Sequence, residues 1–225
     1  MKLIQFTLLF ICFSLLSIAQ TPNSSLKFKN DLIRQKLKGK IATVTEKDYN
    51  ALGDSLILKS VSTFDDNGNE TEFFTYSASG ATLSKTTFKY NDSGKLVEEQ
   101  RYKADGALNV KTTCKYDEKG NKIEESNFDA SGTLFMKVAS KFDGKGNRIV
   151  KDSYNEFGSL FLKCNSKFDD KGNEVEAKEY DSHHGLKYTT TYDYDKADNA
   201  GNWTRKTTYK NDEPAAVTLR EITYR

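Results

Sequence analysis

The sequence is poor in the residues that interrupt strands and in those that build catalytic or metal sites. It has two prolines, three cysteines, two adjacent histidines and one tryptophan among 225 residues. No set of histidines and cysteines has the spacing of a zinc site, and no nucleophile or phosphate-binding motif is present. We therefore expect no catalytic residue, no cofactor and no metal ion.

Apolar residues are also scarce. They make up 36% of the chain and charged residues 29%, with a mean hydropathy of −0.70. Globular domains average about 45–50% apolar residues, so one thick core is not expected. The 34 basic and 32 acidic residues are interspersed. This balance argues against a nucleic-acid partner.

The N-terminus has the pattern of an export signal. Met1 and Lys2 give a positive start, Leu3 to Ile18 form a mostly apolar run, and small residues precede Gln20. We expect residues 1–19 to be a signal peptide cleaved between Ala19 and Gln20. A membrane anchor is the alternative, but the run is short and interrupted by polar residues. The mature protein would then lie in the periplasm, on the outer surface or outside the cell, with no stable membrane span.

Residues 20–39 are predicted to be a linker or a short helix, followed by a single domain over residues 40–225. Asn30 and Asp31 stand before Leu32, Ile33 and Leu37, with Gly39 beyond them. This order fits a helix with an N-cap and a glycine stop, and an ordered linker fits equally well.

From Lys40 onward the sequence repeats every 26 residues. Two glycine columns, two aromatic columns and one leucine column keep this period. The first glycine column is Gly68, Gly94, Gly120, Gly146 and Gly172, and the aromatic column before it is Phe64, Tyr90, Tyr116, Phe142, Phe168 and Tyr194. Such regularity predicts an array in which each unit packs on its neighbours.

Each unit reads as one β-hairpin and its connection to the next. Asp117 to Asn121 has the chemistry of a type I turn closed by a glycine bulge, and Asp129 to Gly132 follows the same logic. The two prolines, Pro22 and Pro214, lie outside the repeats, as strands that need every N–H require.

Residues alternate along the longer strands. In Leu134–Phe142 and Leu160–Phe168 one face is moderately apolar and the other is rich in lysine. The shorter strands are less clear, because Ile149 and Tyr154 are five positions apart. Either a bulge intervenes or the sheet is weakly two-sided.

Two consequences follow from this strand order. Glutamates 72, 98, 124 and 176 should form cross-strand ladders with the lysine columns, worth about 0.2–1 kcal/mol per pair. Four strand steps separate Cys114 from Cys164, roughly 19 Å, whereas a disulfide needs Cα atoms within about 7 Å. We therefore predict two free thiols.

The ends of the array are degenerate. Residues 40–59 and 195–225 read as capping units that cover open edges. Asp195 to Asn202 looks like a first turn lengthened by three residues. The predicted fold class is all-β, with tandem β-hairpins in one long, twisted antiparallel meander sheet. Rolling toward a barrel is the alternative.

Several motifs resemble known repeat families. The segments YDEKGN at Tyr116, FDGKGN at Phe142, FDDKGN at Phe168 and YDYDKADNAGNW at Tyr192 resemble the YD repeats of Rhs-like proteins. The second turn with its G-x-L pattern resembles MORN-like repeats, and both ends of the domain resemble small secreted proteins of Bacteroidetes-type bacteria. The resemblance implies twisted or rolled antiparallel sheets and leaves the activity open.

Three residues stand out from the repeat as ligand-binding candidates. Trp203 is the single tryptophan, and an exposed aromatic ring or a cap of the array are the two interpretations. His183 and His184 lie in a slipped second turn, either as ligand-binding residues or as a solvent-exposed insertion.

We predict an exported, non-catalytic protein that binds or scaffolds at the cell envelope through an extended sheet surface. Its partner would be an unidentified protein or glycan. A purely structural spacer is the alternative, and a hydrolase with a distributed carboxylate site is a further one.

Overall fold

The computed structural model describes residues 29–225, which form one short helix and 14 strands. The elements are α1 (Asp31–Arg34), β1 (Ile41–Asn50), β2 (Leu56–Phe64), β3 (Glu70–Ser77), β4 (Thr82–Tyr90), β5 (Leu96–Lys103), β6 (Leu108–Tyr116), β7 (Lys122–Asp129), β8 (Leu134–Phe142), β9 (Arg148–Asn155), β10 (Leu160–Phe168), β11 (Glu174–Asp181), β12 (Leu186–Ala197), β13 (Trp203–Lys210) and β14 (Glu213–Tyr224). The predicted signal peptide and its cleavage site lie outside the described residues. No helix within residues 29–225 has the length and apolar character needed to cross a membrane.

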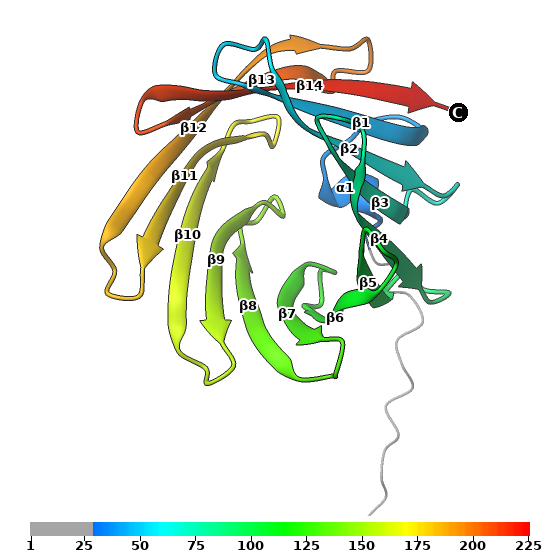
Figure 1. Ribbon diagram of the computed structural model, residues 1–225, viewed down its shortest axis with the longest axis vertical. Helices are drawn as coiled ribbons and strands as arrows, with labels where there is room; N and C mark the ends of the chain where they lie inside the picture. Colours follow the sequence, from blue (N-terminus) through cyan, green and yellow to red (C-terminus); the bar gives the residue numbers. More distant parts are fainter. Residues whose placement is uncertain (1–28) are drawn as a thin grey trace, which may run out of the picture.

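All strands are antiparallel and belong to one closed barrel (Figure 1). Each strand pairs with its neighbours in sequence, and β1 pairs with β14 from Ile41 opposite Tyr224 to Asn50 opposite Ala216. The predicted open meander sheet is therefore wrong. The two end units do not cover open edges but pair with each other. Closure removes two rows of unpaired N–H and C=O groups, which an open sheet would expose at its edges.

The repeated turns follow the predicted chemistry. In the β6–β7 turn, Gly120 has φ +77° and its N–H donates to the carbonyl oxygen of Asp117 at 3.0 Å. The Asp117 carboxylate accepts bonds from the backbone N–H groups of Lys119 (2.9 Å) and Asn121 (2.8 Å). The Asn121 side chain returns to the same carboxylate at 2.8 Å. The sequence Asp-x-x-Gly-Asn therefore satisfies its own turn.

These turns divide the barrel into two ends. The Asp-x-x-Gly-Asn turns gather at one end, where residues 29–39 lie across the barrel (Figure 1). We call residues 29–39 the plug and this end the plugged end. The shorter second turns, such as residues 130–133 and 156–159, form the far rim.

A β-bulge explains the irregular alternation of the short strands. Lys141 lies opposite Val150, but the next residue, Phe142, lies opposite Arg148, so Ile149 is the extra residue. Bulges also replace the lengthened turn expected at Asp195. Strand β12 continues to Ala197 through two register shifts, and an ordinary turn closed by Gly201 follows.

The two faces of the sheet have different chemistry. Leu134, Val138 and Phe142 of β8 point inward, whereas Lys137 and Lys141 are exposed on the outer wall. The expected outer ladder is confirmed at three of its four glutamates, by ion pairs of Lys85 with Glu72 (2.5 Å), Lys115 with Glu124 (2.8 Å) and Lys167 with Glu176 (2.9 Å). Cys114 and Cys164 are free thiols, as predicted.

Candidate functional site

The plug is a short helix held by an apolar contact. Asn30 caps it, accepting a bond from the Ile33 N–H at 2.9 Å, and the helix ends at Arg34, before the predicted glycine stop. Leu32 and Leu37 are buried in one apolar cluster with Ile41, Val44 and Phe64. Burying each leucine contributes about 1.5–3 kcal/mol toward seating the plug.

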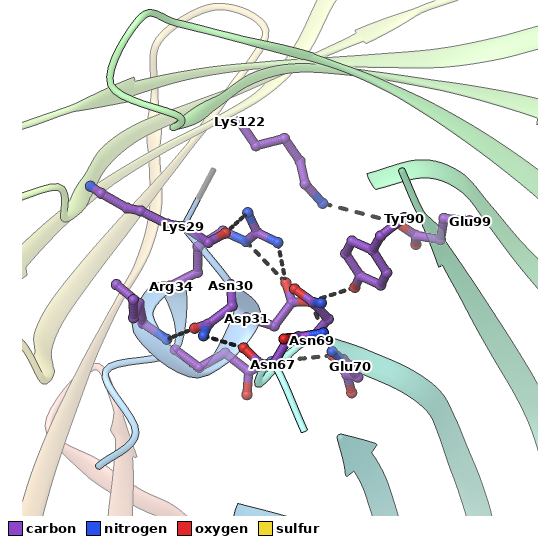
Figure 2. A network of polar contacts seen from close by, with 12 residues as sticks. Lys29, Asn30, Asp31, Arg34, Asn67, Asn69, Glu70, Tyr90, Glu99 and Lys122 are labelled. Carbon is purple, nitrogen blue, oxygen red and sulfur yellow. Dashed lines mark hydrogen bonds and ion pairs between the residues drawn. The ribbon is translucent and has the colours of Figure 1, made fainter. Parts of the chain in front are cut away.

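The Asp31 carboxylate is the polar centre of the plug (Figure 2). It accepts bonds from the Arg34 guanidinium at 2.6 and 2.9 Å and from the backbone N–H of Glu70 at 2.9 Å. The hydroxyl group of Tyr90 donates to the same carboxylate. Because the donors come from the helix, β3 and β4, Asp31 joins the plug to the inner wall.

Further contacts carry the plug across the end of the barrel. Lys29 Nζ donates to Asn121 Oδ1 at 3.1 Å, and Lys36 Nζ donates to the Lys145 carbonyl oxygen at 3.2 Å. The backbone of Lys38 exchanges bonds of 2.8 and 2.9 Å with the Asn202 side chain. The turn asparagines therefore hold the plug as well as their own turns.

A cavity of about 540 Å³ lies between the plug and the inner wall. Much of its wall comes from two repeat columns that face each other across the first turns: the aromatic residues that end the long strands and the residues that begin the short ones. Phe64 and Tyr116 of the first column do not line it. The facing pairs are Phe64 with Glu70, Tyr90 with Leu96, Tyr116 with Lys122, Phe142 with Arg148 and Phe168 with Glu174.

The second of these columns, at the start of the short strands, changes in residue type from unit to unit, whereas the first stays aromatic. Its members are Glu70, Leu96, Lys122, Arg148, Glu174 and Trp203, each two residues after the turn glycine. The first five line the large cavity, and Glu174 and Trp203 line a second one. The turn glycines and the aromatic residues are kept from unit to unit, whereas the residue type at this position changes. The backbone is therefore repeated, but the cavity lining differs from one unit to the next.

Charged groups inside the barrel are shifted by burial. Burial raises the pKa of Glu70 to about 7, with the nearby Asp31 charge adding to the effect. Burial also raises the pKa of Glu99. Lys122 Nζ lies 3.0 Å from Glu125 Oε1 and 3.9 Å from Glu99 Oε2. Although burial lowers the pKa of Lys122, the two carboxylates outweigh this and raise it, so the lysine stays charged.

Glu99, Cys114 and Glu125 are the described residues whose ligand atoms come close enough for a metal ion, within 4.8 Å of one another. Burial raises the pKa of the Cys114 thiol to about 11, which keeps it protonated at neutral pH. The Lys122 ammonium already balances the two carboxylates. This group is therefore an internal ion-pair cluster.

Trp203 lies at the start of β13 and faces the interior at the plugged end. Its ring is 5.5 Å from that of Tyr194, and the Arg220 guanidinium lies 3.3 Å from the ring centroid. It lines a second cavity of about 130 Å³ beside the plug. Trp203 is half-buried and lines this cavity. Its ring points inward, a position that neither the exposed-ring interpretation nor the cap interpretation of the sequence describes.

His183 and His184 lie at the far rim, exposed in the β11–β12 turn. His184 has φ +63°, and the His183 N–H donates to Asp181 Oδ1 at 2.9 Å. The structure does not bring the histidines together with Trp203, which lies at the plugged end.

Sequence reasoning missed Asp31, Arg34 and Tyr90 as site residues. Asp31 and Arg34 precede the repeats, so no column identifies them. Tyr90 belongs to an aromatic column that contains both tyrosine and phenylalanine, so its hydroxyl group does not stand out. A sequence signal exists for the cavity lining alone: the residue two positions after each turn glycine changes from unit to unit.

Fold and cavities together define a single-chain antiparallel β-barrel with an internal plug. The fold is similar to that of a porin-like protein from Bacteroides uniformis, with a TM-score of 0.50, 11% identity, and coverage of 88% of this chain and 99% of that chain. The TcdB2-TccC3 structure matches at a TM-score of 0.30 and 17% identity, over 74% of this chain and 10% of that one. No family model and no curated protein matches the chain, so the YD and MORN-like likeness stays a resemblance.

Proposed function

We propose that this is an exported, non-catalytic binding protein of the cell envelope that holds a small molecule in the cavity beneath its plug. The observation that carries this proposal is the cavity of about 540 Å³, lined by members of two repeat columns and by plug residues between Lys29 and Lys36. Ligand sites commonly have volumes of about 300–1,000 Å³ and combine apolar walls with a few polar groups. The concave interior takes the place of the extended sheet surface expected from the sequence.

The outer wall supports a water-facing barrel. Lysines 85, 111, 137 and 163 and lysines 89, 115, 141 and 167 form two columns of outward side chains. A lysine on the lipid face of a membrane barrel costs about 2–4 kcal/mol at the bilayer midplane. An envelope protein in an aqueous compartment fits this surface. The likeness to the porin-like protein is a likeness of fold alone.

The lining indicates the kind of ligand. Phe88, Leu96, Phe142 and Phe168 provide apolar and aromatic surface, and Arg34 and Arg148 provide cationic groups beside it. A small molecule with a ring or short acyl part and a polar group matches this combination. We include Trp203 among the binding residues, whereas His183 and His184 lie at the other end and stay outside the proposed site.

The neutral fluorescent probe N-phenyl-1-naphthylamine tests the cavity. The protein from Gln20 onward should bind it saturably, with enhanced emission. Phe168→Ala, which removes an aromatic wall of the cavity, should weaken binding about tenfold, since one buried aromatic contributes at least 1.4 kcal/mol.

A matched control lies on the same strand. Phe161 of β10 is exposed on the outer wall, so Phe161→Ala should leave probe binding unchanged. Loss of binding in Phe161→Ala with retention in Phe168→Ala would place the probe on the outer surface and contradict the proposal.

A further inference from the structure

The second cavity, of about 130 Å³, is unusually rich in cations. Lys36 and Lys38 of the plug, Lys171 of the β10–β11 turn and Arg220 of β14 line it. Four cations from three separate parts of the chain converge on a space the size of a few water molecules.

One carboxylate is found among the residues that line this cavity. Glu174 lines the cavity, and Glu46 is bonded to the Arg220 guanidinium at 2.6 and 2.8 Å. Asp169 and Asp198 stand nearby in the turns as ionised carboxylates outside the lining, where each accepts bonds from its own turn backbone. Lys171 and the Lys38 ammonium have no ion pair among the described residues. Among the residues that line the cavity, four cations therefore face one carboxylate, and the ammonium groups of Lys38 and Lys171 remain available to a bound anion.

The aromatic residues fix the geometry of the cation-rich wall. The Arg220 guanidinium lies over the Trp203 ring, 3.3 Å from its centroid, and Lys206 Nζ lies 5.3 Å from the same centroid. The Tyr194 hydroxyl donates to the Glu174 carbonyl oxygen at 2.8 Å, which holds the second aromatic ring of the lining in place. A guanidinium clamped between a carboxylate and an indole ring is pre-positioned for planar or tetrahedral oxyanions.

We propose that this cavity binds a compact oxyanion, of the phosphate, sulfate or carboxylate class. The proposal rests on the proposed function in one respect: Gln35, Lys36, Gly172 and Glu174 line both cavities, so the oxyanion would be the head group of the ligand in the larger cavity. The ligand would then be an anionic amphiphile whose charged group lies against Lys36, Lys171 and Arg220.

Trp203 is the single tryptophan in the chain, so its fluorescence reports on this cavity directly. The protein from Gln20 onward is titrated with sodium sulfate, and separately with inorganic phosphate and acetate, at constant ionic strength set with sodium chloride. We expect a saturable change in Trp203 emission with at least one of the three anions. Lys171→Gln should weaken that binding about tenfold, the size expected for loss of one charge-assisted hydrogen bond.

Quenching gives an independent readout that does not require tight binding. Iodide should quench Trp203 more efficiently than neutral acrylamide does, relative to free tryptophan. Lys171→Gln should lower iodide quenching and leave acrylamide quenching unchanged. Lys141→Gln, on the outer wall, is the matched control and should change neither.

The outcomes separate the two proposals. Sulfate, phosphate and acetate without saturable effect, or an unchanged response in Lys171→Gln, would overturn the oxyanion site even if the neutral probe binds the larger cavity. Anion binding without neutral-probe binding would support the oxyanion site and count against the larger cavity alone.

Discussion

The hydroxyl group of Tyr90 donates a hydrogen bond to the carboxylate of Asp31, 59 positions earlier in the chain. One partner lies in the plug and the other closes a long strand of the repeat. This contact joins the single non-repeated element of the described chain to the wall of the barrel (Figure 2).

Tyr90→Phe removes this contact alone. Hydrogen bonds to charged groups contribute about 1.5–3 kcal/mol, so we expect the free energy of unfolding to fall by about 2 kcal/mol in urea denaturation. Tyr102→Phe is the control, because that hydroxyl donates to the neutral Gln100 amide on the outer wall. It should cost about 1 kcal/mol or less. Equal losses in the two variants would show that the plug contact is not special.

Two turn glycines separate backbone strain from seating of the plug. Both have positive φ, +79° at Gly68 and +86° at Gly80. A Cβ at Gly68 would meet Asn30 Nδ2 at 2.7 Å and Leu32 Cδ1 at 2.9 Å, whereas one at Gly80 meets nothing within 4 Å. Gly80→Ala should cost about 1–2 kcal/mol from strain alone.

Gly68→Ala should cost at least about 1 kcal/mol more, because the plug must shift. Thermal unfolding of both variants measures the difference. If the two midpoints coincide, the plug does not press against the β2–β3 turn.

Glu70 should make stability depend on pH. Its pKa is raised from 4.5 to about 7 in the folded protein, chiefly by burial. Between these values the folded state binds more protons than the unfolded state, so stability falls as pH rises and the full penalty remains above pH 7. The shift corresponds to roughly 3 kcal/mol at most.

Glu70→Gln should therefore stabilise the protein at pH 8 and change little at pH 4, as measured by urea denaturation at each pH. Gln35 Nε2, 3.1 Å from Glu70 Oε2, retains an acceptor in this variant. Part of the dependence of stability on pH should remain in this variant, since burial raises the pKa of Glu99 as well. Glu72→Gln, on the outer wall, is the control, and a slope that persists in full in Glu70→Gln would contradict this assignment.

Lys122→Ala should destabilise the barrel by about 2–3 kcal/mol, because it leaves Glu99 and Glu125 partly buried without their shared cation. The double variant Lys122→Ala with Glu99→Gln should recover part of the loss, since one of the two facing charges is then removed. Equilibrium unfolding of the two variants provides the test, and no recovery in the double variant would argue that Lys122 acts through packing.

The sequence predicts the local structure of this barrel well, because each turn and strand depends on nearby residues. Leu134–Phe142 and Leu160–Phe168 are strands as expected, and Asp117 with Gly120 makes the predicted turn. Closure was not predictable. The alternation of a strand shows which side chains share a face, but it does not show whether β1 and β14 end as free edges or pair.

The site was harder to predict for a related reason. Trp203 was noticed because its residue type is unique, yet its partner Arg220 is an ordinary residue of a degenerate end unit. Asp31 lies in a segment without periodicity, and its role depends on a barrel end that exists only after closure. Residues such as Arg148 line a cavity only because the repeat units close into a barrel.

Pairing of β1 with β14 is the central claim, and disulfide formation tests it most directly. Lys47 and Leu219 lie opposite each other on the outer wall. In protein from Gln20 onward with Cys114→Ser and Cys164→Ser, the pair Lys47→Cys and Leu219→Cys should form an intramolecular disulfide on mild oxidation, because opposed Cα atoms lie about 4.5–5.5 Å apart. In an open sheet of 14 strands the same positions would be roughly 60 Å apart. Free thiols or intermolecular dimers alone would contradict the closed barrel.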